Sequence, residues 1–181
     1  QETARFALST MELDVQLAGF WGLTGDAAHI SGTIGNAPLS LPTAAARCGT
    51  EFPLDLRRPV DGTNNTYALP CAATGGAQAG SDVLVVRRAD PEPVPADGDR
   101  LQIYTTRDGA GNALFLSHTA PGATGPGAEI HDLAAVAYYV SGNSTGQAGL
   151  PSLRRKVLRG GPSITDEEIM PGVEDLQIQF G

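Results

Sequence analysis

One segment of this sequence has the spacing of an amphipathic α-helix, and it stands at the N-terminus. Its apolar residues recur at intervals of three and four, which places them on one face of a helix. They are Ala4, Leu8, Met11, Val15 and Ala18, with an adjoining row of Phe6, Leu13, Leu17 and Phe20. Gly19 and Gly22 are expected to end the helix. We predict a core face made of Leu8, Met11, Val15, Phe20 and Trp21.

The rest of the chain favours turns and strands. With 23 glycines and 13 prolines among 181 residues, many irregular connections are expected. Residues 82–88, 133–140 and 152–159 resemble strands, residues 101–106 and 113–117 form a hairpin around the turn at 108–112, and 173–180 ends in a further strand. The predicted fold class is α+β, with the N-terminal helix packed on antiparallel β-sheet. No internal repeat or domain linker is evident.

Two cysteines lie in a long region of weak periodicity, residues 23–80. Cys48 and Cys71 stand 23 residues apart, without the neighbouring Cys and His spacing of a zinc site. A disulfide in an oxidising compartment is the favoured interpretation, and two buried, unpaired thiols are the alternative. Such a disulfide would brace the long loops and stabilise the fold by about 3 kcal/mol.

The charge balance argues against polyanionic partners. The chain has 20 acidic and 12 basic residues, a formal net charge of −8. An acidic surface repels nucleic-acid phosphates and anionic lipids, so we predict no nucleic-acid partner. The one basic cluster, Arg154-Arg155-Lys156 with Arg159, is interpreted as a solvated strand edge.

A single stretch matches a catalytic motif. Gly142-Asn-Ser-Thr-Gly146 has the G-x-S-x-G pattern of a nucleophile elbow and follows a predicted strand. However, no helix pattern follows Ser144, and the last histidine, His131, precedes it instead of following it. We interpret the stretch as a turn, and no catalytic residue is predicted.

No metal or cofactor site is predicted either. The histidines His29, His118 and His131 lie far apart and lack the spacing of a zinc-binding helix. The acidic groups at 97–99 and 166–168 do not fit a calcium-binding loop and are interpreted as solvated acids. The sequons that begin at Asn64 and Asn143 indicate exposed loops.

Four stretches together resemble the PilW-like minor pilins of type IV pili. In the first, the matching residues are Glu2, Arg5, Phe6, Ala7, Asp14, Ala18, Gly19, Phe20, Trp21 and Gly22, with Gln16 where the family usually has Arg. The others are 80–89, 137–140 with 149–155, and 171–181, in the family's order. The family is related to pseudopilin J of type II secretion.

The resemblance implies a structural role without catalysis. Residues 1–22 would be the C-terminal part of a pilin helix, and residues 23–181 a β-rich globular head. A cleaved leader and an apolar anchor helix would precede Gln1. The subunit would contact the membrane only through that anchor helix. The subunit would stand in the inner membrane and periplasm before assembly and on the cell surface afterwards. Its partners would be other minor pilins in the complex that primes the pilus and forms its tip. Family chains commonly continue past the position of Gly181.

Three other functions stay open at this point. A type II secretion pseudopilin would share the architecture but serve protein export. A surface adhesin or binding module would use the 23–80 region, although Tyr67 is the one aromatic residue well inside it. A hydrolase would use Ser144.

Overall fold

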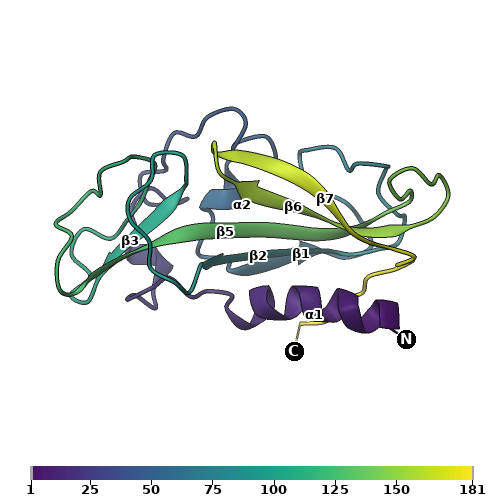
Figure 1. Cartoon of the computed structure of the whole chain (residues 1–181), viewed down its shortest axis with the longest axis horizontal. Helices are drawn as coiled ribbons and strands as arrows, with labels where there is room; N and C mark the ends of the chain where they lie inside the picture. Colours follow the sequence, from purple (N-terminus) through teal and green to yellow (C-terminus); the bar gives the residue numbers. More distant parts are fainter. Residues whose placement is uncertain (1, 181) are drawn as a thin grey trace.

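The computed structural model describes residues 2–180 and consists mainly of antiparallel β-sheet (Figure 1). Gln1 and Gly181, which belong to two of the four stretches that resemble minor pilins, lie outside the described residues. The helices are α1 (Glu2–Gln16), the single 3-10 turn η1 (Ala27–His29) and α2 (Glu51–Leu54). The strands are β1 (Val60–Thr63), β2 (Val83–Ala89), β3 (Gln102–Thr106), β4 (Ala113–Phe115), β5 (Ala128–Ser141), β6 (Ser152–Arg159) and β7 (Ser163–Pro171).

The long strand β5 organises the sheet and runs through the middle of the molecule (Figure 1). It pairs antiparallel with β2, β3 and β6, and the outer strands β1, β4 and β7 each pair with one of these. The hairpin expected around residues 108–112 is confirmed as β3 and β4. All seven residues of β2 are buried, because both faces of the sheet are covered there.

Alternate residues of β2 separate two apolar clusters. Val83 and Val85 point into the larger cluster, which lies under the loops of the 23–80 region. Leu84 and Val86 point into the smaller cluster, which lies on the side of α1 and includes Met11. Trp21 belongs to the larger cluster and is 2% exposed. Phe20 is partly buried and packs its ring edge-on against the ring of His131.

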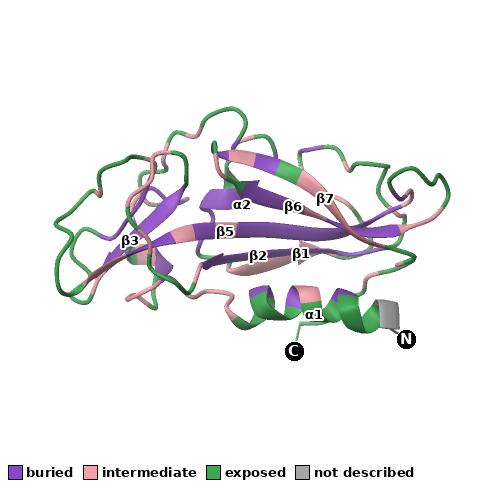
Figure 2. Ribbon diagram, viewed as in Figure 1, coloured by how far each residue is buried: buried purple, intermediate pink, exposed green. Residues whose placement is uncertain are grey.

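The expected α+β class, with a pilin-like helix packed on the sheet, is wrong. Within residues 2–180 the structure is mostly antiparallel β-sheet, and the one helix of appreciable length has 15 residues. This helix lies along the sheet (Figure 2). It contacts the sheet through one narrow row of side chains, in which Ala7, Met11 and Asp14 are buried. The frequent Gly and Pro and the β-branched runs leave no other segment able to form a long helix.

Two members of the predicted core face are not in the core. Leu8 is 64% exposed and Val15 is 47% exposed, whereas Met11 is buried. The apolar face of α1 is wider than the strip of the helix that touches the sheet. Only the side chains on that strip are buried, and those on either side of it stay exposed. The polar Asp14 takes a buried position that the apolar pattern would not assign to it, because its carboxylate meets hydrogen-bond donors of the sheet.

Two further expectations are corrected at the C-terminus. Residues 173–180 form no strand. The N–H groups of Leu176 and Ile178 donate to the Ser81 hydroxyl at 3.0 Å and to the Asp82 carboxylate at 2.7 Å, where a strand would donate to backbone carbonyls. The last strand is instead β7, which pairs with β6. Because β6 lies between β5 and β7, its basic cluster is no strand edge, and Arg154 and Lys156 are buried.

Candidate interaction surface and polar clusters

Helix α1 is fixed to the sheet by a polar contact. The Asp14 carboxylate accepts a hydrogen bond from Arg88 Nε at 2.8 Å and another from the Tyr138 hydroxyl at 2.6 Å. Arg88 lies on β2 and Tyr138 on the neighbouring strand β5, where their register partners are Ala134 and Leu84, so the two side chains reach Asp14 from positions four residues apart. Arg88 also forms an ion pair with Asp90. Because these groups are buried and mutually satisfied, they define where α1 lies on the sheet.

The flanks of α1 carry exposed apolar side chains. Phe6 and Leu13, which are 51% and 54% exposed, lie seven residues apart and therefore on one flank of the helix. Leu8 and Val15 are also seven residues apart and lie on the other flank. Figure 2 shows the outward surface of α1 as largely exposed. Large apolar side chains grouped on one element mark an interaction surface more often than scattered ones do. We call these four residues the α1 flanks.

The predicted disulfide between Cys48 and Cys71 is confirmed, with an S–S distance of 1.95 Å. Both cysteines are buried in the larger apolar cluster, 2% and 6% exposed. The segment after Cys71 is tied to the sheet: Lys156 Nζ donates to Ala72 O at 2.7 Å, and Thr74 N donates to the Tyr139 hydroxyl at 3.0 Å. The disulfide thus closes a loop that the sheet also holds.

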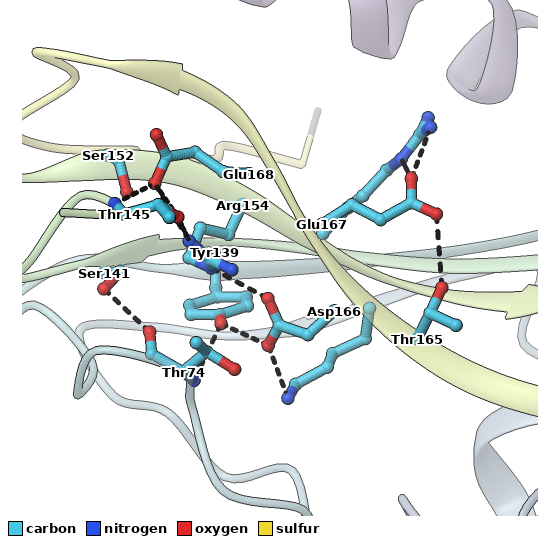
Figure 3. Close-up of polar contacts among 12 residues, drawn as sticks. Thr74, Tyr139, Ser141, Thr145, Ser152, Arg154, Thr165, Asp166, Glu167 and Glu168 are labelled. Carbon is cyan, nitrogen blue, oxygen red and sulfur yellow. Dashed lines mark hydrogen bonds and ion pairs between the residues drawn. The ribbon is translucent and has the colours of Figure 1, made fainter.

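The densest polar cluster joins β5, β6 and β7 (Figure 3). At its centre the Asp166 carboxylate accepts from Arg154 Nε at 2.8 Å and from the Tyr139 hydroxyl at 2.6 Å, and Lys156 Nζ lies 2.6 Å away. Glu168 continues the cluster and pairs with Arg154 Nη1 at 2.9 Å. Two cations thus face two carboxylates, and we call this group the Asp166 cluster.

The electrostatics of the Asp166 cluster favour structure over proton transfer. Burial alone would raise the pKa of the Asp166 carboxyl, but hydrogen bonds from Lys156, Tyr139 and Arg154 outweigh it and lower the pKa to about 2. Burial, and then the hydrogen bond to Asp166, raises the pKa of the Tyr139 phenol above its ordinary value. At neutral pH the carboxylate therefore stays ionised and the phenol protonated, and neither is poised as an acid or base.

The residues of the possible hydrolase motif do not form a triad. Ser144 is buried, and its hydroxyl donates to the Glu168 carboxylate at 2.9 Å. Glu168 is already paired with Arg154. His131 lies at the other end of β5, where its Nε2 is 3.1 Å from Glu129. Ser144 therefore serves to hold the turn after β5 against β7.

The remaining polar candidates stay apart. His29 and His118 are exposed, and His131 is buried beside Phe20. In the part of the chain that the structure describes, no group of three or more His, Cys, Asp or Glu is arranged to hold a metal ion. Asn64 lies in an exposed turn, and the Asn143 amide is hydrogen-bonded to Gly75 O.

Sequence reasoning missed the residues that hold the sheet faces together: Asp14, Arg88, Tyr138, Arg154, Lys156 and Asp166. A signal was present, since β2 carries basic residues at the end of an apolar run and β6 alternates between apolar and basic stretches. A buried cation in a strand requires a carboxylate or carbonyl partner, but the sequence does not say which acid supplies it.

No protein-family model matches the chain, and neither a curated protein nor a solved structure matches it. Over residues 2–180, no helix has both the length and the apolar character needed to cross a bilayer.

Proposed function

We propose that this chain is a structural subunit of a type IV pilus assembly, of the minor-pilin kind that its sequence resembles, and that it docks to sister subunits through the α1 flanks. The observation that carries the proposal is the exposure of Phe6, Leu8, Leu13 and Val15 on a helix held in place by the sheet. The proposal does not depend on a pilin-like α+β fold.

The spacing of the flanks suits a helical partner. Phe6 and Leu13 are two turns apart, so together they form a short ridge along α1. Such a ridge packs into the groove between side-chain rows of a second helix. A sister subunit with the same kind of N-terminal helix is the occupant that matches this geometry. The partners are therefore other minor pilins of the tip or priming complex.

The Cys48–Cys71 disulfide fits the compartment that this role requires. Disulfides form and persist in the periplasm and on the cell surface, where a pilus subunit is stored and then displayed. The buried position of both cysteines protects the bond from reductants.

Co-purification tests the proposal. The domain would be expressed with the soluble domains of the other minor pilins encoded in the same genome, and complex formation would be measured by size exclusion. Two double variants remove one flank each: Phe6→Ser with Leu13→Ser, and Leu8→Ser with Val15→Ser. Because all four side chains are about half exposed or more, we expect the variants to fold.

The control is the double variant Glu12→Ser with Gln16→Ser, which changes the polar face of the same helix. We expect a stoichiometric complex that at least one flank variant loses and the control keeps. If the wild-type domain binds none of these partners, the proposed role is wrong. Binding to the pseudopilins of a secretion system instead would reassign the chain to protein export.

A further inference from the structure

Arg87 differs from the other deeply buried cations of the protein. Arg88, Arg154 and Lys156 each lie within 2.8 Å of a carboxylate. Arg87 is 4% exposed, yet among the described residues no carboxylate oxygen lies within 4.0 Å of it. Burial lowers the pKa of Arg87, and only more distant acids, Asp55 first, oppose that effect. A buried charge without a close counter-ion is costly, so this one calls for an explanation.

The hydrogen bonds of Arg87 leave part of its guanidinium free. Nε donates to Phe52 O and Nη1 donates to Arg58 O, each at 2.6 Å. No hydrogen bond from Nη2 is found within residues 2–180. Among the described residues, Asn112 Nδ2 is a side-chain nitrogen that is fully enclosed and has no hydrogen-bond partner. Arg87 Nη2 is not enclosed in this way. Nη2 therefore borders an accessible space.

Arg87 also lines a cavity of about 540 Å³. It is lined by residues of β2 and of the segment closed by the disulfide, which includes β1. Apolar walls come from Phe52, Leu69, Val83 and Val85. Its volume is in the range of pockets that hold small organic ligands. Its lining is mixed: the apolar walls stand beside the charged side chains of Glu51, Arg58, Asp61 and Arg87.

The charges around the cavity limit what can bind. Arg58 lies at the cavity and is 2.6 Å from Asp55, 3.3 Å from Asp61 and 3.9 Å from Glu51. With Arg87, two cations thus stand against three carboxylates. These acids would repel a dianion such as a phosphate monoester about twice as strongly as a monoanion. A single carboxylate is therefore the anion better suited to the site, where it can pair with Arg87. An apolar group attached to it would contact the apolar walls.

We propose that this cavity binds the carboxylate of a small organic acid or of a peptide C-terminus, with the Arg87 guanidinium as the group that recognises it. The proposal goes beyond the docking role of α1, because it concerns a different face of the sheet. If the α1 flanks do not dock to other pilus subunits, the proposed carboxylate site is unaffected.

Nuclear magnetic resonance titration of the whole domain tests the proposal. The probes are hexanoate against hexanamide, and an N-acetylated apolar tetrapeptide with a free C-terminus against its amide, each to about 10 mM. We expect saturable shifts of the Arg87 Nε–H signal and of the Leu69 and Val83 amides with the carboxylates only. Tighter binding of hexanoate would identify a small organic acid as the ligand. Tighter binding of the tetrapeptide would identify a peptide C-terminus.

Three variants locate the binding. Arg87→Gln removes the charge and is expected to weaken carboxylate binding by about tenfold or more. Ala68→Trp fills the cavity from an exposed wall position, so it tests the site even if Arg87→Gln does not fold. Arg159→Gln removes an exposed cation on β6 and should change nothing.

Equal shifts with the amides would overturn the proposal, because the charge of Arg87 would then play no part. Absence of any saturable shift with both carboxylates would overturn it as well. So would carboxylate binding that survives Ala68→Trp unchanged, since the ligand would then lie elsewhere.

Discussion

The carboxylate of Asp14 on α1 and the guanidinium of Arg88 on β2 form a buried ion pair, with Oδ1 2.8 Å from Nε and side chains 9% and 11% exposed. The Tyr138 hydroxyl completes the contact from β5. The helix that carries the exposed flanks is thus oriented by a polar contact on its opposite, buried row. Orientation of the flanks and stability of the domain therefore depend on the same carboxylate.

Replacing Asp14 by Ala should destabilise the domain by about 3 kcal/mol, because Arg88 and Tyr138 would lose a buried partner. Asp90 still pairs with Arg88 and limits the loss. Asp14→Asn keeps one acceptor oxygen and should cost less than Asp14→Ala. Urea unfolding measures the difference, with the exposed Glu12→Ala as control. A loss below about 1 kcal/mol for Asp14→Ala would mean that α1 is held by apolar contacts instead.

Removing the disulfide should destabilise the fold by about 3 kcal/mol, since the bond closes a loop of 23 residues. The double variant Cys48→Ala with Cys71→Ala keeps the buried sites apolar, so that the loss reports mainly the cross-link. The midpoint of thermal unfolding should fall for this variant, and reductant should then have no further effect on it. An unchanged midpoint would show that the contacts of Ala72 and Thr74 with the sheet suffice to hold the loop.

The sequence predicted local structure better than pairing between distant segments. The β3–β4 hairpin was predictable because a turn signal lies between two short apolar runs. Strand β7 was not, since its residues Asp166, Glu167 and Glu168 resemble a solvated acidic stretch. They form a strand because each acid lies opposite a basic residue of β6, such as Lys156 opposite Asp166. That complementarity appears only once the two strands are paired.

The surface of α1 shows the same limit. Apolar identity predicted the burial of Met11 correctly and that of Leu8 and Val15 wrongly. The deciding factor is the sheet face under the helix, which presents the donors of Arg88 and Tyr138. A helix pattern shows which residues can be buried together, but the partner surface determines which of them are. The cavity lined by Arg87 could not be predicted from the sequence for a similar reason, because its walls come from three separate segments.

The Asp166 cluster predicts a loss of stability in acid. The pKa of Asp166 is lowered from 3.8 to about 2 in the folded protein. A depressed folded pKa contributes stability that is present above the unfolded value and lost as pH falls from about 4 through about 2. Denaturant unfolding across this range should show a steeper fall for the wild type than for Asp166→Asn. The exposed Asp175→Asn should follow the wild type. Parallel curves for wild type and Asp166→Asn would show that Asp166 is not coupled to folding.

The same cluster predicts a loss of stability in alkali, carried by Tyr139. Burial and the hydrogen bond to Asp166 raise the pKa of this phenol above its ordinary value of 10.0. A raised folded pKa contributes stability that is fully present below the unfolded value and is lost as pH rises above about 10. Phenolate absorbance should therefore lag behind that of a free tyrosine and appear together with unfolding. Tyr139→Phe should lower stability at neutral pH, because Asp166 and Thr74 lose a hydrogen-bond partner, and should flatten the alkaline fall. An unchanged alkaline fall in that variant would assign it to Tyr67 and Tyr138, whose phenol pKa values are also raised, chiefly by burial.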